Sequence, residues 1–407
     1  MSTAADQTRQ APQVPPTSGK LVPLEALRGA AAGVVVLYHV VLTFTAKGVG
    51  SVPHGHGVLD LALQFILGLI NGSAAVAVFF VLSGFLVSLP FARDQSATRI
   101  VSSLLKRWPR LAGLTVLGCL ISWLLLTMAG DVYKDAGALI GSHWLATHGN
   151  GPLEGHSVSP LAALWQGMVP AYTTGDVWFD PPLWTMRIEL FCSVASYLTA
   201  PLLFAVRRWD LRLAVAGLGM VLSGVDYPAT YFTDFLFGSL LAIAYAEGRF
   251  PRLTGIQATA LSLLALYLFS FTYQQALLIH APVKAIIPHG NTSHFVWDIA
   301  TGLIMLVLLG HERTARACSG AWAEWVGQIS FPLYLLHVPL LLSVGALTFL
   351  ALHGTLGQAL AASLAGLLSV SLAVAGAVPL FWADKAWTRL VNRTASALIP
   401  PPPANKI

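Results

Sequence analysis

A histidine and an arginine share the first long apolar stretch of the chain, which runs from Leu24 to Ala46. Ten residues separate Arg28 from His39, and all of them except Tyr38 are apolar or small. A helix rises about 1.5 Å per residue, so the two side chains would lie about 16 Å apart along it. A histidine that deep in an apolar helix is costly to bury and indicates a functional site. The alternatives are a packed histidine bonded across helices and, for Arg28, an anchor at the membrane interface.

Two guanidinium groups, those of Arg107 and Arg110, stand three residues apart where another helix is expected to begin. Pro109 suits the first turn of a helix, whose free N–H groups and positive dipole end favour anions. Two arginines at such a position would make a phosphate clamp. A basic cluster that only fixes the orientation of the protein in the membrane is the alternative.

A second charged pair, Arg187 and Glu189, follows Pro182 at the start of a later apolar stretch. Glu189 would lie about 9 Å below the outer end of its helix, in the same half of the membrane as His39. Residues two apart on a helix face different directions, so each of the two charges needs a partner on another helix. The alternative is an ion pair between helices that serves structure alone.

Smaller polar signals accompany these groups. Ser83 stands beside Gly84, and that pair indicates close packing between helices. His337, three residues after Tyr334, is a second histidine within an apolar stretch. We therefore take Ser83, Arg187, Tyr334 and His337 as supporting polar residues of the same site.

The composition indicates that these residues belong to a membrane protein. Of 407 residues, 56% are hydrophobic and 10% are charged, whereas a soluble globular protein carries about 25% charged residues. The apolar runs are long and uninterrupted, as in membrane helices, and do not alternate as in a membrane β-barrel. The sequence thus predicts an all-α integral membrane protein with the lipid bilayer as a partner. The three cysteines suggest neither a disulfide framework nor a metal site.

Applying a length of about 20 residues per crossing gives about ten spans. The predicted spans are 24–46, 73–92, 111–129, 183–206, 211–225, 229–246, 255–279, 295–311, 328–350 and 358–382. With both ends of the chain in the cytoplasm, only Lys47, Lys134 and Lys284 of the 23 lysines and arginines fall on the outer side, and Arg187 lies within a span. This asymmetry predicts an N-in, C-in topology.

One membrane domain, residues 23–384, accounts for nearly all of the chain. A disordered cytoplasmic tail is predicted for 1–22 and a second cytoplasmic tail for 385–407. The longest segment between spans, 130–182, would face the outside, and its many aromatic residues indicate a folded lid or a sugar-facing surface. A purely structural cap at the interface is the alternative. No feature suggests nucleic-acid binding, and the sequence leaves the oligomeric state open.

The ordered motifs resemble those of the acyltransferase-3 family of multi-span membrane acyltransferases, which are mostly bacterial. The similarity covers residues 24–340 and runs through Leu27-Arg28-Gly29 with His39, Phe79 to Leu86, Arg107 to Arg110, Leu183-Trp184-Thr185 with Glu189, Phe237-Gly238 and Tyr334 to His337. Members often close with an acidic residue and proline after the last span, whereas Asp384-Lys385 stands here. Some members also carry an extracytoplasmic hydrolase-like domain after the last helix.

The resemblance implies transfer of an acyl group, usually acetyl, from acyl-CoA to a hydroxyl, often of a sugar, at the bacterial cell membrane. Acyl-CoA would be the donor substrate, with no permanently bound cofactor. His39 could act as a general base or as a covalent relay, and Glu189 could orient its imidazole or bind the acceptor. Arg28, Arg107 and Arg110 would bind the donor phosphates on the cytoplasmic side.

Two alternative functions remain at this stage. The acceptor could be a glycosylated small metabolite instead of a sugar or glycan of the cell envelope. The buried His, Arg and Glu side chains could instead line the path of a carrier or exporter, although the sequence lacks the inverted repeats that many transporters show.

Overall fold

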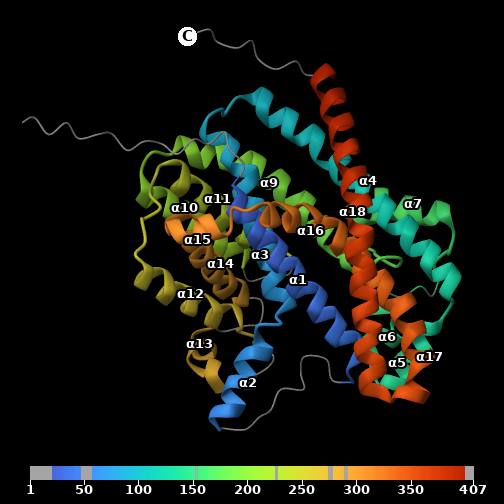
Figure 1. Cartoon of the computed structure of the whole chain (residues 1–407). Coiled ribbons are helices and arrows are strands. Elements are labelled where there is room, and N and C mark those ends of the chain that lie inside the picture. Colours follow the sequence, from blue (N-terminus) through green and yellow to red (C-terminus); the bar gives the residue numbers. More distant parts are fainter. Residues whose placement is uncertain are drawn as a thin grey trace, which may run out of the picture.

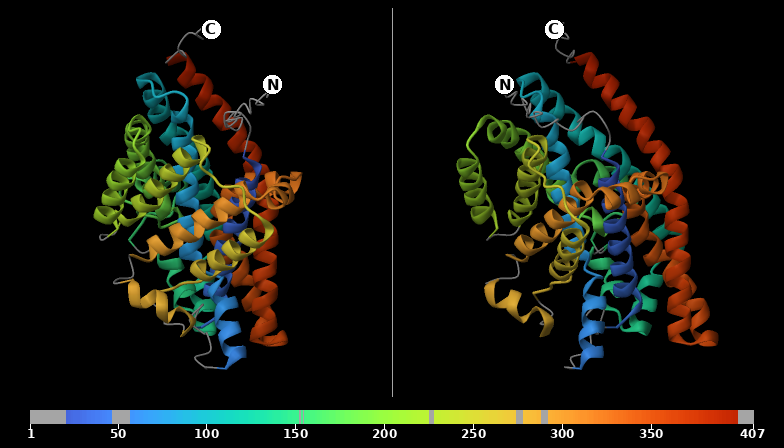
Figure 2. Two further views of the ribbon diagram at one scale, coloured as in Figure 1. Left: turned by 90° about the vertical axis from the view of Figure 1, so that its left-hand side faces the viewer. Right: turned by 60° about the vertical axis from the view of Figure 1, so that its left-hand side comes forward.

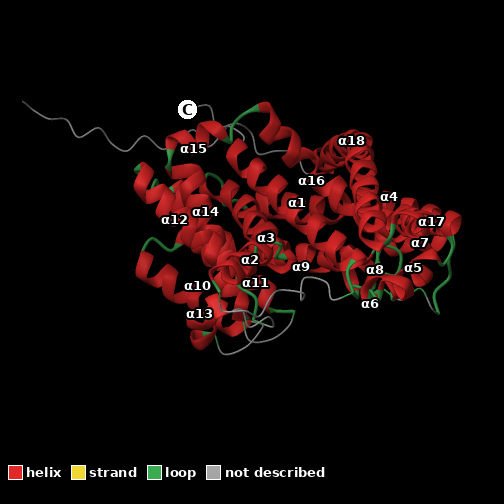
Figure 3. Cartoon of the chain, turned by 60° about the horizontal axis from the view of Figure 1, so that its bottom comes forward, coloured by secondary structure: helices red, strands yellow, loops and turns green. Residues whose placement is uncertain are grey.

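The computed structural model describes residues 21–46, 57–151, 153, 155–224, 228–273, 278–287 and 292–398. Within these ranges every regular element is a helix (Figure 3). The predicted all-α fold is confirmed for this part of the chain. Residues 1–20 of the predicted tail 1–22 and residues 399–407 of the predicted tail 385–407 lie outside the described residues.

Each predicted span overlaps at least one helix of the structure, although the helix at 255–279 ends at Phe269 (Figure 1). The larger helices are α1 (Val22–Phe44), α3 (Gly72–Ser88), α4 (Ala97–Ala129), α9 (Thr185–Ala205), α10 (Trp209–Ser223), α11 (Thr230–Ala246), α12 (Gly255–Phe269), α14 (Ser293–Gly310), α16 (Ala321–Leu340), α17 (Ala346–Leu356) and α18 (Gln358–Leu398). Shorter helices are α2 (Val58–Gly68), α5 (Val132–Ile140), α6 (His143–Ala146), α7 (Pro160–Met168), α8 (Pro170–Thr173), α13 (Ala281–Ile286) and α15 (Glu312–Ala317). The single turns are η2 (Leu89–Ala92), η3 (His148–Asn150), η4 (Pro181–Trp184), η5 (Leu278–His280) and η7 (Leu341–Gly345).

Seven helical stretches in the described part of the chain are long and apolar enough to cross a membrane. They are α1, α3 with η2, α4, η4 with α9, α14, the run from α16 through α17, and α18. Helices α2, α11 and α12 are apolar but shorter. The chain thus has the build of a multi-pass membrane protein, and the predicted number of about ten spans and the N-in, C-in topology stay predictions.

Glycines allow α1 to lie directly against α16. A Cβ atom on Gly29 would collide with Val326, and one on Gly327 would collide with the side chain of Glu25. Small residues let two helix backbones approach closely in a membrane, where packing replaces the hydrophobic effect as the driving force. The contact sets the register in which residues further along α1 meet residues of α16.

Helices α3 and α11 interlock in the same way. A Cβ atom on Gly84 would collide with the carbonyl oxygen of Phe235, and one on Gly238 would collide with the carbonyl oxygen of Val81. The close helix packing that Ser83 and Gly84 predicted is therefore confirmed. It fixes the position of α11 relative to the centre of the bundle.

Gly84→Ala is expected to destabilise the protein, because the added methyl group meets backbone atoms that cannot rotate away. Overpacking of this kind costs about 1–3 kcal/mol, and more where backbone must move. The measurement is the midpoint of thermal unfolding of the purified protein in detergent. Gly33→Ala is the matched control, since a Cβ atom there has no neighbour within 4 Å. Equal midpoints for the two variants would contradict the interlocked packing.

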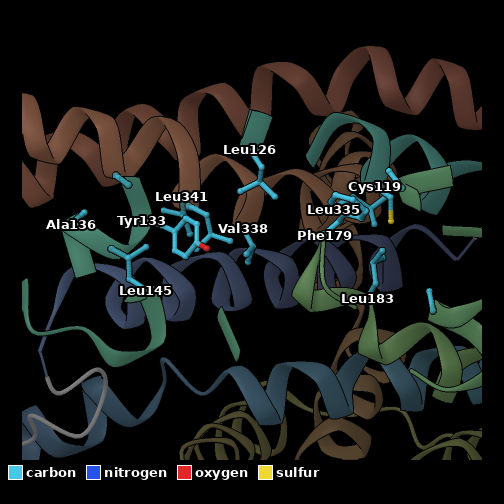
Figure 4. Close-up of a cluster of buried hydrophobic side chains, with 14 of the residues drawn as sticks. Cys119, Leu126, Tyr133, Ala136, Leu145, Phe179, Leu183, Leu335, Val338 and Leu341 are labelled. Atoms are coloured by element: carbon cyan, nitrogen blue, oxygen red, sulfur yellow. The ribbon is translucent and has the colours of Figure 1, made fainter. Parts of the chain in front are cut away.

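The segment 130–182 folds into short helices that join the largest group of buried apolar side chains. Figure 4 shows this group spread along α4 and α16, with the side chains of α5 and α6 at one end and those that precede α9 at the other. The labelled members from the segment are Tyr133, Ala136, Leu145 and Phe179. The described residues of this segment are thus folded, whereas its role as a lid or sugar-facing surface and its place outside the membrane stay predictions.

The later part of that segment runs back along α4. Trp108 Nε1, in the first half of α4, donates a hydrogen bond to the carbonyl oxygen of Met168 (3.1 Å). Further along α4, Thr115 Oγ1 donates to Gly167 O (2.8 Å), and Ser122 Oγ donates to the carbonyl oxygen of Phe179. Helix α7 therefore lies beside the middle of α4, and the chain returns towards Ser122 before α9 begins.

As a consequence, α9 begins inside the bundle. Pro181, Pro182 and Leu183 at its start are buried, and the hydroxyl of Tyr334 on α16 donates to the carbonyl oxygen of Pro182 (2.6 Å). Proline lacks a backbone N–H, so a start rich in proline leaves fewer unsatisfied donors in the interior.

The last helix, α18, runs along the length of the molecule (Figure 2). It continues to Leu398, so residues 385–398 of the predicted tail are helical. Trp387 Nε1 donates to the carbonyl oxygen of Pro109 (2.7 Å), which ties this extension to the first half of α4.

Candidate active site

His39 and His337 meet between α1 and α16. His39 Nδ1 lies 2.9 Å from the carbonyl oxygen of Val35, and His337 Nδ1 lies 2.7 Å from that of Tyr334. A carbonyl oxygen only accepts, so each Nδ1 carries the proton of its neutral ring. His337 Nε2 lies 3.1 Å from His39 Nδ1 and is a second acceptor for the same N–H, in a bifurcated hydrogen bond. His39 Nε2 keeps its lone pair, which a general base or nucleophile needs.

A cavity of about 650 Å³, here called the His39 cavity, lies beside this histidine. Tyrosine and tryptophan side chains line part of its wall, among them Tyr38, Trp144, Trp184 and Tyr334. The Trp144 ring, on α6, is 5.4 Å from the His39 ring between centroids. The segment 130–182 thus contributes a side chain to the wall, as the lid interpretation requires.

A second cavity of about 540 Å³, here called the arginine cavity, contains the predicted donor-binding residues. Arg28, Arg107 and Arg110 all line it. Carboxylates balance them: Arg28 forms an ion pair with Glu25, and Arg107 forms one with Glu189. The arginine cavity thus brings the three guanidinium groups together, as the phosphate-clamp interpretation requires. The predicted helix start at Pro109 is wrong: α4 begins at Ala97, so Arg107 and Arg110 lie inside the helix, away from its free N–H groups.

The two cavities meet at shared side chains. Val76 and Tyr334 line both of them. Tyr334 is held in place, because its hydroxyl is 2.6 Å from the carbonyl oxygen of Pro182 and 3.1 Å from Thr185 Oγ1. Val76 and Tyr334 therefore mark the place where the two cavities lie against each other.

The predicted position of Glu189 beside His39 is wrong. Glu189 lines the arginine cavity and pairs with Arg107 across to α4. The depth estimate assumed that α9 begins at the outer surface of the membrane, whereas α9 begins inside the bundle and carries Glu189 towards the arginines. The predicted need for a partner on another helix is met by Arg107.

The other supporting residues separate into two environments. Ser83 lines the arginine cavity, and His337 contacts His39. Arg187 belongs to neither cavity wall, and its Nη1 donates to the carbonyl oxygen of Thr174 in the segment 130–182 (3.1 Å). Its role in the site stays a prediction.

The sequence did not identify several residues of these cavities as site residues, and Trp144 and Asp384 are two of them. Trp144 lies within a long segment between spans, where nothing in the pattern singled out one aromatic residue. Asp384, on α18, lines the arginine cavity and interacts electrostatically with Arg110. A carboxylate directly after a predicted span was the available signal for Asp384.

Comparison with known proteins identifies the family. The acyltransferase domain of that family matches residues 22–382, which include every residue of both cavities named above except Asp384. The chain belongs to the acyltransferase-3 family.

A similar protein supports the assignment of the chain to this family. O-acetyltransferase PaAT-1 of Phomopsis amygdali is 25% identical over 371 residues, which cover 79% of this chain and 72% of that protein. No solved structure matches the chain. The acyltransferase therefore presents its histidine pair and its arginine cluster in two adjoining cavities within the family domain.

Proposed function

We propose that this protein is an O-acyltransferase that moves an acyl group, usually acetyl, from acyl-CoA to a hydroxyl of a cell-envelope sugar or glycan. The observation that carries the proposal is the pair of cavities that meet at Tyr334: arginines line one, and His39 lines the other. The name of the Phomopsis amygdali relative, an O-acetyltransferase, supports an oxygen acceptor and an acetyl group.

Arg28, Arg107 and Arg110 would hold the phosphates of the donor. Each guanidinium has five N–H donors, so an ion pair with one carboxylate leaves donors for a phosphate. Arg107 Nε has no hydrogen-bond partner in the part of the chain that the structure describes. The phosphates and the thioester of acyl-CoA lie at opposite ends of its pantetheine arm. The phosphates could therefore occupy the arginine cavity while the thioester reaches the His39 cavity.

His39 would act as the general base. Its Nε2 takes the proton of the acceptor hydroxyl while the hydroxyl oxygen attacks the thioester carbonyl carbon. The carbon–sulfur bond then breaks, and the departing CoA thiolate takes the proton back from His39. In the protonated state, the Val35 carbonyl oxygen and the His337 Nε2 lone pair both face His39 Nδ1–H and stabilise the cation.

We place this activity in the bacterial cell membrane, with the arginine cavity open to the cytoplasm, where acyl-CoA is made. The basic residues near the starts of α1 and α4 support that orientation. The acceptor would reach the His39 cavity from the opposite side, beneath the segment 130–182.

The proposal predicts that the purified full-length protein releases CoA from acetyl-CoA and forms an ester on a supplied methyl glycoside. CoA is measured as free thiol, and the ester is identified by mass spectrometry. His39→Ala protein serves as the control for non-enzymatic reaction. Lack of both products, with acetyl-CoA and with longer acyl-CoA donors, would contradict the proposal and favour a carrier.

A further inference from the structure

One wall of the His39 cavity comes from α11 and α14, away from the histidine pair. It contains Tyr231 of α11, and Ser293, His294 and Trp297 of α14. The interlocked glycines of α3 and α11 fix this wall, because Gly84 packs on the backbone of Phe235, one residue after Asp234. The mechanism proposed above uses none of these side chains.

His294 is oriented by a carboxylate behind it. Its Nδ1 lies 2.8 Å and 3.0 Å from the two carboxylate oxygens of Asp234, and Asp234 is fully buried. A carboxylate that faces one ring nitrogen fixes the tautomer and raises the basicity of the other nitrogen. Asp298, one turn further along α14, is a second buried acid, which attracts a positive charge on His294 and repels a negative charge on Asp234. His294 Nε2 is thereby prepared to accept a hydrogen bond from a molecule in the cavity.

Ser293 supplies an independent indication of a ligand. It lines the cavity and is 1% exposed, and its Oγ has no hydrogen-bond partner among the described residues. A buried hydroxyl without a partner costs about 1–3 kcal/mol. A bound molecule that forms a hydrogen bond with Ser293 Oγ would remove this cost.

Aromatic rings flank the same position. The Tyr231 ring stands edge-on to the His294 ring at 4.8 Å between centroids, and the Trp297 ring does so at 5.1 Å. Ligand sites commonly combine apolar and aromatic walls with a few polar groups that fix orientation. Among the polar groups here, His294 Nε2 offers an acceptor and Ser293 Oγ offers a hydroxyl.

We infer that Ser293 and His294 form a subsite that binds a second, non-reacting hydroxyl of a polyhydroxylated acceptor ring. Asp234 is the positioning residue of this subsite. The inference rests on the proposed function, in which a first hydroxyl of the acceptor meets His39. The second hydroxyl donates to His294 Nε2 and accepts from Ser293 Oγ, and the flanking rings pack against the carbon face of the acceptor. A monohydric alcohol cannot occupy both positions.

The direct test is equilibrium binding of methyl glycosides of glucose, galactose and mannose to the full-length protein without acetyl-CoA. The protein is placed in lipid nanodiscs, because maltoside detergents themselves carry sugar. Binding is followed by tryptophan fluorescence, to which Trp297 contributes. We expect saturable binding of at least one glycoside and about a tenfold or greater weakening in His294→Phe protein.

Ser293→Ala removes only one oxygen atom, so it still tests the subsite if His294→Phe protein fails to fold. We expect it to weaken binding about fivefold. His280→Gln is the matched control: His280 is a buried histidine that bonds to Ser270 and lines neither cavity. Absence of glycoside binding to wild type, or equal binding by wild type and Ser293→Ala protein, would overturn the inference.

Kinetics separate this inference from the proposed function. With acetyl-CoA as donor, wild type should show a higher kcat/KM for the bound glycoside than for 1-propanol. Ser293→Ala should reduce this ratio about fivefold and leave the KM for acetyl-CoA unchanged. Asp234→Asn, which keeps an acceptor oxygen for His294 Nδ1, should retain more of the preference than Asp234→Ala. Glycoside binding without any acyl transfer would contradict the proposed function alone. Acyl transfer with a preference that none of these variants changes would contradict the subsite alone.

Discussion

His39→Ala protein is expected to lose acyl transfer by about 10³-fold or more while it still folds and inserts into the membrane. Removal of a general base costs about 10²–10⁴-fold in rate, and the His337 ring cannot replace His39. His337 lines neither cavity, and its Nδ1 is committed to the Tyr334 carbonyl oxygen. The measurement is kcat for CoA release from acetyl-CoA in the presence of an acceptor, together with gel filtration of the purified protein.

His353→Ala is the matched control for the loss of an imidazole. His353, on α17, bonds through Nδ1 to a backbone carbonyl oxygen three residues earlier, much as His337 does, and it lines neither cavity. It should keep wild-type kcat. A folded His39→Ala protein with normal turnover would exclude His39 as the base. An acetyl group found on wild-type His39 by mass spectrometry would instead show that His39 works as a covalent relay.

The sequence predicted the elements well because membrane helices leave a simple signal. A run of about 20 apolar residues has few alternatives to a helix in a bilayer, since every backbone polar group must be satisfied within the segment. Helix α4 begins at Ala97, well before its predicted span at residue 111, because its basic first turns extend beyond the apolar run. Helix α18 passes its predicted end for the same reason.

The partners of the polar residues were harder to predict. The length of an apolar run gives no information on a preceding segment that turns back along a neighbouring helix. A start of α9 at the membrane surface therefore predicts the wrong depth for Glu189. The contact between His39 and His337 depends on how α1 and α16 are aligned, which Gly29 and Gly327 decide through close packing. Spacing within one helix contains no such information.

Arg107→Ala is the second variant with a large expected effect, and it should act on two properties at once. Loss of a charge-assisted bond to a phosphate costs about 1.5–3 kcal/mol, so the KM for acetyl-CoA should rise about tenfold to a hundredfold. The variant also leaves Glu189, whose side chain is only 12% exposed, without its cationic partner. Breaking a buried pair from one side costs about 3–5 kcal/mol, so the yield of folded protein should fall.

The double variant Arg107→Ala/Glu189→Gln separates these two effects. A neutral amide at position 189 no longer needs a cation, so thermal stability should recover towards wild type, while the KM for acetyl-CoA should stay high because the phosphate donor is still missing. Arg107→Lys should recover the charge without the planar fork that suits a phosphate, and its KM should fall between wild type and Arg107→Ala. Lys106→Ala removes a neighbouring positive charge that lines neither cavity and should leave the KM for acetyl-CoA unchanged. A double variant with wild-type KM would mean that Arg107 serves only to neutralise Glu189, and donor binding would then rest on the other arginines of the cavity, Arg28, Arg99 and Arg110.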